Sequence, residues 1–321
     1  MLLHLFFIAF GMAMLIIGGD FLVSGSSALA RRFKISELAI GLTIVAFGTS
    51  APEFVVSFIA SINGNPEIAL GNVIGSNIVN LLLVLGITGL LAPVAVQKKT
   101  IFIEIPFSLF AAILLFVLAN FGLIYGNANT LDRIDGIILL LFFCLFILYV
   151  FKSMKAQENG DEKTNEIPTP IWKTTLFIVL GLVLLVAGGR FVVNAAVNLA
   201  LALNISEKII GLTIVAVGTS LPELVTSVVA IIKKKSDIAI GNIIGSNIFN
   251  LLFVLGVSTV ARPMTYSPVF NRDIYIFFAG TLLLFAAMFT GKKRILDRWE
   301  SAVFLLLYIG YVVFLIMTEG A

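Results

Sequence analysis

Long apolar segments alternate with short polar connections along almost the whole chain. A run of roughly 17–25 mostly apolar residues is long enough to cross a bilayer as a helix. Ten segments of about this length or slightly longer can be drawn, with ends defined to about two to four residues. They lie at 3–27, 37–62, 67–91, 101–120, 134–151, 171–198, 207–232, 238–261, 273–290 and 299–317. The pattern predicts an all-α polytopic membrane protein with ten transmembrane helices.

One long polar stretch, residues 152–170, divides these segments into two groups of five. It reads KSMKAQENGDEKTNEIPTP, which is charged, rich in helix-breaking residues and almost free of large apolar ones. Such a composition is typical of a mobile linker rather than a folded domain. We therefore expect a first half at 1–151 and a second half at 171–321.

The two halves contain the same passage. Residues 36–86 align with residues 206–256 at an offset of about 170, and roughly 33 of the 51 paired positions are identical. A second match relates LIIGGDFLVSGSSALA at 15–30 to LVAGGRFVVNAAVNLA at 185–200. Because each half has an odd number of predicted spans, the second copy enters the membrane in the opposite direction. The sequence thus predicts two inverted five-helix repeats, an architecture shared by many secondary transporters.

Composition supports the membrane class, and charge gives an orientation. The chain is 60% hydrophobic and 12% charged, with a mean hydropathy of +1.10, far from the values of soluble domains. Connections after the odd-numbered segments carry about 16 Lys and Arg residues against about 4 on the opposite side, and this excess marks the cytoplasmic side. We expect both termini outside the cell, the 152–170 loop in the cytoplasm, and the plasma membrane as location. The net charge of +3 then reflects orientation, not nucleic-acid binding.

Each copy of the repeat places one glutamate inside an apolar segment. In GTSAPE, Pro52 lacks an N–H and clashes with the carbonyl one turn earlier, near Gly48, so the helix should kink or unwind there. Thr49 and Ser50 precede Glu53 by four and three residues, which would place their hydroxyls on its helix face. Carboxylate, hydroxyl and freed carbonyl oxygens together suit a hard cation. The second copy, GTSLPE, repeats these residue types at Gly218, Thr219, Ser220, Pro222 and Glu223.

The second part of each copy reads GNVIGSNIVN or GNIIGSNIFN. Its GxxxG spacing lets helix backbones approach closely, and this alone indicates packing. Ser76 and Asn80 lie four residues apart, as do Ser246 and Asn250, so each pair can present oxygens along one stripe. Buried asparagines and hydroxyls can equally serve as interhelical or local hydrogen bonds. The glutamates differ, because neither has a Lys or Arg within a helical turn, and an unneutralised carboxylate at membrane depth indicates function. Asn72, Asn77, Asn242 and Asn247 add further amides.

Other charged residues have structural interpretations. Asp20 and Arg190 occupy equivalent repeat positions with opposite charge, which favours boundary placement or a local ion pair over substrate contact. Glu104, near Pro106, is interpreted as interfacial. Four acidic residues suit helix N-termini, and they are Asp132, Asp135, Asp297 and Glu300.

Several function classes fit poorly. The chain has one His and one Cys, both far from the repeated motif, so a zinc-type intramembrane hydrolase lacks ligands. No Ser/His/Asp set, CxxC, Walker loop or dinucleotide fingerprint is present, and we expect no enzyme and no cofactor. A channel usually builds its filter from rings of repeated subunits, whereas two carboxylates in inverted repeats fit alternating access better.

At GTSAPE with GSNIVN and GTSLPE with GSNIFN, the chain resembles the cation/calcium exchanger superfamily, specifically prokaryotic sodium/calcium exchangers. The resemblance covers essentially the whole chain. It implies a mid-membrane diamond made by Glu53, Asn80, Glu223 and Asn250. It also implies cation sites completed by Thr49, Ser50, Ser76, Thr219, Ser220 and Ser246 and by the carbonyls of Ala46 and Ala216. In similar exchangers calcium and sodium compete for overlapping sites, and the first and sixth helices slide across the remaining bundle.

The sequence therefore leads us to expect a monomeric antiporter in the lipid bilayer that couples Na⁺ influx to Ca²⁺ extrusion. Many family members carry aspartate at one of the positions occupied here by Asn80 and Asn250, so stoichiometry, electrogenicity and potassium dependence stay open. A proton/calcium exchanger, or one for another divalent cation such as magnesium or manganese, is the alternative. Calcium is favoured over magnesium because flexible oxygen ligands suit an ion that takes 6–8 of them.

Overall fold

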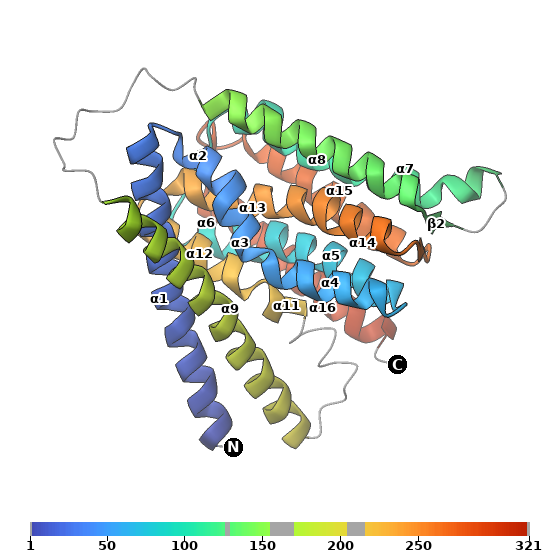
Figure 1. Ribbon diagram of the computed structural model, residues 1–321, viewed down its shortest axis with the longest axis horizontal. Coiled ribbons are helices and arrows are strands. Elements are labelled where there is room, and N and C mark those ends of the chain that lie inside the picture. Colours follow the sequence, from blue (N-terminus) through green and yellow to red (C-terminus); the bar gives the residue numbers. More distant parts are fainter. Residues whose placement is uncertain (1, 126–128, 155–169, 204–215, 320–321) are drawn as a thin grey trace.

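The computed structural model describes all residues except 1, 126–128, 155–169, 204–215 and 320–321 (Figure 1). Within that part, eight helices are long and apolar enough to cross a membrane, and one bent pair makes a ninth span. Four spans are single helices in the periphery or at the chain ends: α1 (Leu2–Phe33), α8 (Arg133–Met154), α9 (Ile171–Ala202) and α16 (Arg298–Glu319). Two others are η3–α7 (Thr100–Glu104, Ile105–Tyr125) and α15 (Phe270–Ala287).

The three remaining spans carry the repeated motifs. One is bent and consists of α2 (Glu37–Ile40), η1 (Gly41–Val45), α3 (Ala46–Thr49) and α4 (Ala51–Ile62). The other two are α5–η2–α6 (Pro66–Ile78, Val79–Val84, Leu85–Leu91) and α13–η5–α14 (Ser236–Ile248, Phe249–Val254, Leu255–Ala261). The η segments are π-helical turns, which are frequent at functional sites.

Nine of the ten predicted segments coincide with these spans. For the tenth, predicted at 207–232, the structure describes α11 (Ala216–Thr219) and α12 (Leu221–Ile232), while 207–215 lie outside the described residues. The total of ten helices thus stays a prediction. The greater part of the 152–170 stretch also lies outside the described residues.

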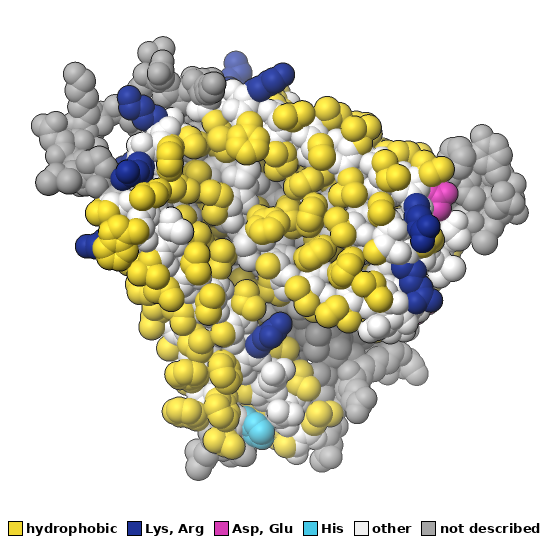
Figure 2. Space-filling view, viewed as in Figure 1, with side chains coloured by type: hydrophobic (Ala, Val, Ile, Leu, Met, Phe, Trp, Pro, Cys, Tyr) yellow, Lys and Arg dark blue, Asp and Glu magenta, His cyan; other side chains and the backbone are white. Residues whose placement is uncertain are grey.

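The spans differ in how deeply they are buried. The most apolar windows of α5–α6 and α13–α14 are 78% and 94% buried, whereas those of α8, α9 and α16 are 22% buried. Figure 2 shows hydrophobic side chains covering most of one face, with Lys and Arg mainly toward its edges. The fold therefore surrounds two polar-bearing helices with apolar ones whose outer faces suit lipid.

The two long helices α1 and α9 lie side by side and extend beyond the rest of the molecule (Figure 1). Glycines bring their backbones together: a Cβ at Gly18 would lie 2.9 Å from the Gly181 carbonyl, and one at Gly11 would lie 2.8 Å from the Gly188 carbonyl. Small residues permit this close approach in membrane helices. Phe21 and Phe177 stack across the same pair with ring centroids 5.2 Å apart.

Two short antiparallel ribbons join connections from the two halves. β1 (Val94–Ala95) pairs with β4 (Ile295–Leu296), and β2 (Thr130–Leu131) pairs with β3 (Met264–Thr265). They link segments far apart in the sequence and fix the ends of the spans that follow.

Acidic residues begin two helices, as expected from the sequence. Asp132 Oδ1 accepts the Asp135 N–H at 3.0 Å, while the Asp132 N–H donates to Asp135 Oδ2 at 2.8 Å. The Asp297 N–H donates to Glu300 Oε2 at 2.8 Å. These bonds satisfy N–H groups that a helix start leaves unpaired. Of the two interpretations offered for Asp20, boundary placement or an ion pair, the structure shows an ion pair, with Lys233 Nζ 2.6 Å from its Oδ1.

Candidate cation-binding site

The span that carries Glu53 is broken where the sequence predicted a kink. Its two parts, Glu37–Thr49 and Ala51–Ile62, meet at 49°. Ser50 stands at the break with φ −81° and ψ 5°, and Pro52 lies in the first turn of α4. Because proline cannot donate to the carbonyl one turn earlier, the helix is interrupted here. In the second copy Ser220 has φ −88° and ψ 8° between α11 and α12.

Both glutamates of the motif are fully buried, and each accepts a hydroxyl from the other copy. The Ser50 hydroxyl donates to Glu223 Oε1 at 3.0 Å, and the Ser220 hydroxyl donates to Glu53 Oε1 at 3.3 Å. Ser76 adds a longer bond to Glu53 Oε1 at 3.5 Å. Each carboxylate is therefore hydrogen-bonded to the span that carries the other one, and the two lie in one site. The spacing of a straight helix predicted each serine hydroxyl beside the glutamate of its own copy. Because the helix breaks at each serine, the hydroxyl instead bonds to the glutamate of the other copy.

Thr49 also reaches the other half of the chain. Its hydroxyl lies 3.0 Å from Asn242 Oδ1 and 3.4 Å from the hydroxyl of Ser246, both on α13, and it also donates to the Ala46 carbonyl at 3.3 Å. The backbone N–H of Ser50 donates to the same carbonyl at 3.0 Å. Two bonds thus hold Ala46 O in the local turn. Thr219 ends α11 and Ala216 begins it.

Two asparagines hold the backbone of the glutamates, a role that the sequence analysis did not predict. Asn72 Nδ2 donates to the Glu53 carbonyl at 3.2 Å and to a neighbouring serine hydroxyl. Asn242 Nδ2 donates to the Glu223 carbonyl at 3.3 Å in the same way. In both copies the asparagine follows its glutamate by 19 residues. That equal spacing was the available signal, but it is not a helical period, so only the packing of two helices reveals the contact.

The asparagines expected at the centre lie in π-helical turns. Asn80 is in η2 and Asn250 is in η5, and both are fully buried. Asn250 Nδ2 donates to Asn77 Oδ1 at 3.2 Å, and Asn77 Nδ2 donates to the Asn247 carbonyl at 3.4 Å. Asn77 and Asn247 thus connect the two most buried spans. Neither amide atom of Asn80 has a hydrogen-bond partner among the described residues.

Several buried oxygens lack a hydrogen-bond partner within the part of the chain that the structure describes, and four of them belong to the residues expected at the centre of the site. These four are Glu53 Oε2, Glu223 Oε2, Asn80 Oδ1 and Asn250 Oδ1. A buried polar atom left unpaired costs about 1–3 kcal/mol, and more when it is charged. Neither glutamate forms an ion pair with a described Lys or Arg. Oxygens of this kind are the ligands that calcium and sodium accept, and a cation would satisfy them.

Carboxylate, amide and hydroxyl oxygens are the chemistry of the site. Where residues are described, no three His, Cys, Asp or Glu side chains gather as a metal centre. The arrangement therefore differs from zinc and other transition-metal sites, which rely on imidazole and thiolate. An oxygen-only site with two carboxylates can hold hard cations reversibly.

Comparisons with known proteins point in one direction. A family model described as sodium/calcium exchanger protein matches residues 3–152 and 173–317. The chain is 42% identical to the putative antiporter CaxA of Alkalimonas amylolytica over 97% of this chain and 98% of the relative. It is 32% identical to the sodium/calcium exchanger MaX1 of Methanosarcina acetivorans over 95% and 96%, respectively.

The structure is also similar to solved ones. A structure of the sodium-calcium exchanger NCX_Mj soaked with 10 mM Na⁺ and zero Ca²⁺ matches with a TM-score of 0.80 and 33% identity, covering 97% of this chain and 98% of that one. A second, soaked with 2.5 mM Na⁺ and 10 mM Sr²⁺, matches with a TM-score of 0.81 and 32% identity at the same coverage.

Proposed function

Since this chain belongs to the sodium/calcium exchanger family, we propose that it is a sodium-driven calcium antiporter working by alternating access. It is a membrane-embedded exchanger, and the ions exchanged by its family are Na⁺ and Ca²⁺. The proposed direction is Na⁺ influx coupled to Ca²⁺ extrusion. A sodium gradient directed into the cell would supply the free energy.

The observation that carries the proposal is the set of unpaired, buried oxygens on Glu53, Glu223, Asn80 and Asn250. Two carboxylates would balance the charge of one Ca²⁺, and the amide and hydroxyl oxygens would replace part of its hydration shell. With the carboxylates serving both ions, calcium and sodium would exclude each other. Mutual exclusion at a site exposed alternately to each side is what couples two fluxes.

Ligands are proposed from both copies of the motif. Beyond the four residues above, the hydroxyls of the repeated motifs would complete the site. These are Thr49, Ser50, Ser76, Thr219, Ser220 and Ser246. The carbonyls of Ala46 and Ala216 are proposed as further ligands. The Ala46 carbonyl would take part only when the local turn opens, because in this structure it accepts two hydrogen bonds.

The proposed architecture is two inverted five-helix repeats, 1–151 and 171–321, which together make ten spans. The excess of Lys and Arg on one side places the 152–170 loop in the cytoplasm and both termini outside. We place the protein in the plasma membrane. We also propose that it is a monomer, because the reciprocal hydrogen bonds of Ser50 and Ser220 link the two copies of the motif within one chain.

Reconstituted vesicles test the function. Vesicles loaded with sodium and diluted into sodium-free medium should accumulate radiolabelled calcium, with potassium and proton gradients imposed separately as further arms. Uptake driven by a pH gradient alone and indifferent to sodium would replace the proposal with a proton/calcium exchanger. Competition by magnesium or manganese at equal concentration would identify another divalent substrate.

Two variants test the site. Glu53→Gln and Glu223→Gln keep the shape of the side chain but remove one charge each, and calcium uptake should fall to background in both. Glu67→Gln is the matched control, since this glutamate is exposed at the start of α5. Undiminished uptake in either buried variant would contradict the proposed site while leaving the family assignment intact.

A further inference from the structure

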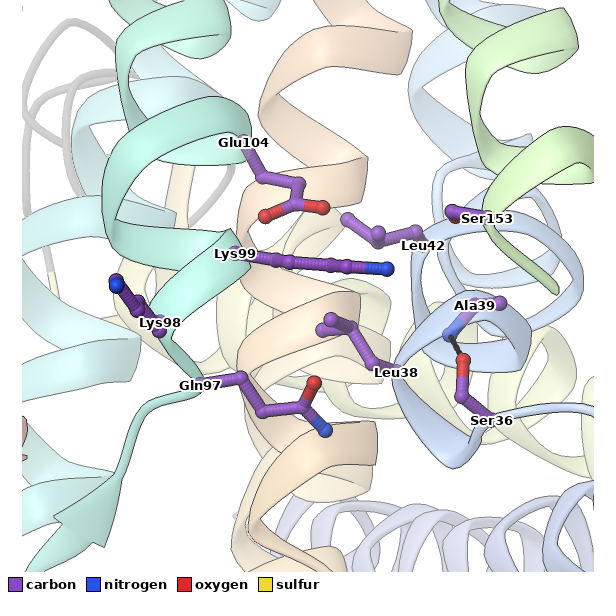
Figure 3. Close-up of a pocket in the computed structure, with 9 residues that line it drawn as sticks. All are labelled: Ser36, Leu38, Ala39, Leu42, Gln97, Lys98, Lys99, Glu104 and Ser153. Atoms are coloured by element: carbon purple, nitrogen blue, oxygen red, sulfur yellow. Dashed lines mark hydrogen bonds between the residues drawn. The ribbon is translucent and has the colours of Figure 1, made fainter. Parts of the chain in front are cut away.

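A second polar cavity lies apart from the glutamate site, between η1, η3 and α8. Its volume is about 240 Å³. Figure 3 shows its lining, which combines charged, hydroxyl and apolar groups: Ser36, Leu38, Ala39, Leu42, Gln97, Lys98, Lys99, Glu104 and Ser153. The positive-inside assignment places this end of the molecule at the cytoplasmic boundary of the bilayer.

One wall of the cavity carries a buried carboxylate that is only half satisfied. Glu104 is 2% exposed, and its Oε1 accepts the Tyr149 hydroxyl at 2.6 Å. Its Oε2 has no hydrogen-bond partner in the described part of the chain. Because leaving a buried charged oxygen unpaired is unfavourable, this atom indicates a ligand that donates hydrogen bonds.

Lys99, which carries the opposite charge, lines the same cavity but does not form an ion pair with Glu104. Lys99 extends from the start of η3 across the cavity toward Leu42, whereas Lys98 points away from it (Figure 3). The ion pairs found between described residues do not include Lys99 with Glu104. The cavity therefore offers a cation and an anion that attract each other across one space without forming an ion pair.

This charge arrangement selects among ligands. A simple anion would be attracted by Lys99 but repelled by Glu104, and a simple cation would meet the reverse. A small zwitterion with a phosphate at one end and a primary ammonium at the other can satisfy both. Ser36 lines the same space and its hydroxyl, which accepts the Ala39 N–H, still has a proton to donate to a phosphate oxygen. The Ser153 hydroxyl also lines the cavity but donates to the Val150 carbonyl. A quaternary ammonium lacks the N–H donors that Glu104 Oε2 requires.

Exposed apolar side chains beside the cavity indicate that such a headgroup is attached to lipid. Phe102 and Ile103, next to Lys99 in η3, are 52% and 40% exposed, and Phe151 on α8 is 58% exposed. We propose that this cavity binds a phosphoethanolamine headgroup, with the phosphate against Lys99 and the ammonium against Glu104, supplied by a bilayer phospholipid.

Native mass spectrometry of the purified full chain tests the proposal. The protein is incubated with equimolar ethanolamine and choline phospholipids of identical acyl chains, and the lipids retained on the protein are counted. A charged hydrogen bond is worth about 1.5–3 kcal/mol, so retention of the ethanolamine lipid should exceed that of the choline lipid by about tenfold or more. Glu104→Gln should remove most of this preference, whereas Lys99→Gln should lower retention of both lipids, because both carry the phosphate. Lys152→Gln, an exposed lysine of α8 that does not line the cavity, should retain the preference.

Each outcome decides the matter. Equal retention of the two lipids by the unmodified protein would overturn the proposal. A preference that persists in Glu104→Gln, unchanged total retention in Lys99→Gln, or a stronger preference for an anionic phosphatidylglycerol would also overturn it. Soluble phosphoethanolamine forms a further arm. If it displaces the lipid at millimolar concentration, the cavity recognises the headgroup itself, and free phosphoethanolamine is also a ligand. If it does not, the acyl chains are required. The readout is independent of ion transport, so it holds even if the transport proposal fails.

Discussion

At the scale of single residues, the central feature is that each serine at a helix break serves the glutamate of the other copy. Residue types were sufficient to single out Glu53 and Glu223, which the structure buries and links to the other copy, because a buried carboxylate without a basic neighbour is informative by itself. The pairing was not predictable. Ser50 precedes Glu53 by three residues, yet it bonds to Glu223, since the break at that position ends the helical period on which the expectation depended.

The hydroxyls of Ser50 and Ser220, which each bond to the glutamate of the other copy, should contribute equally to the affinity for calcium. Removing one hydrogen bond to a charged group costs about 1.5–3 kcal/mol, so Ser50→Ala and Ser220→Ala should each weaken calcium binding roughly 10- to 100-fold. Isothermal titration of the purified protein measures this. Ser61→Ala is the control, because this buried hydroxyl donates to the Ser258 carbonyl. A loss in only one of the two site variants would show that the copies do not contribute equally.

At the scale of elements, the sequence predicted where the spans lie better than it predicted the π-helical turns inside them. Charged and helix-breaking residues bound each apolar segment, so nine predicted segments coincide with helical spans. Most ends agree to within a few residues, but α1 continues to Phe33, six residues beyond its predicted end. The bend at Ser50 was predicted from Pro52 and is confirmed. The π-helical turns at 79–84 and 249–254 were not predictable, because they depend on tertiary packing rather than on a breaker residue.

The GxxxG spacing of the second copy has the structural role that its pattern indicated. A Cβ on Gly241 would lie 2.8 Å from the Leu38 carbonyl and 2.9 Å from Gly41 Cα. Since backbone atoms cannot move aside cheaply, Gly241→Ala should destabilise the protein by about 1–3 kcal/mol and lower its Tm in detergent. Gly310→Ala is the matched control, because no described atom outside its own helix lies within 4 Å of the added Cβ. An unchanged Tm for Gly241→Ala would show that the bent span can shift away.

At the scale of the whole molecule, one ion pair among the described residues connects the α1–α9 pair to the remaining bundle. Lys233 lies 2.6 Å from Asp20 of α1, and it donates to Ser24 at 2.6 Å. If alternating access moves this pair of helices as one body, the contact between Asp20 and Lys233 must break during each cycle. An exposed ion pair contributes only about 0–1 kcal/mol, so it would permit that movement.

Cross-linking tests the movement. In a chain with Cys144 replaced by alanine, a bifunctional thiol reagent joining Asp20→Cys to Lys233→Cys should stop calcium exchange, and a cleavable linker should restore it after reduction. Phe21→Cys with Phe177→Cys is the control, since these stacked residues connect α1 to α9 and would move together. Transport that continues with the first link in place would contradict sliding of this helix pair.

The reciprocal bonds of Ser50 and Ser220 also bear on how such a protein could arise and be divided. A polypeptide containing one copy alone would lack the serine that the other copy contributes to its glutamate. It would therefore need a second molecule inserted upside down to complete the site. Two separately expressed fragments, split within 152–170, should accordingly complement each other in one membrane, and neither should move calcium by itself.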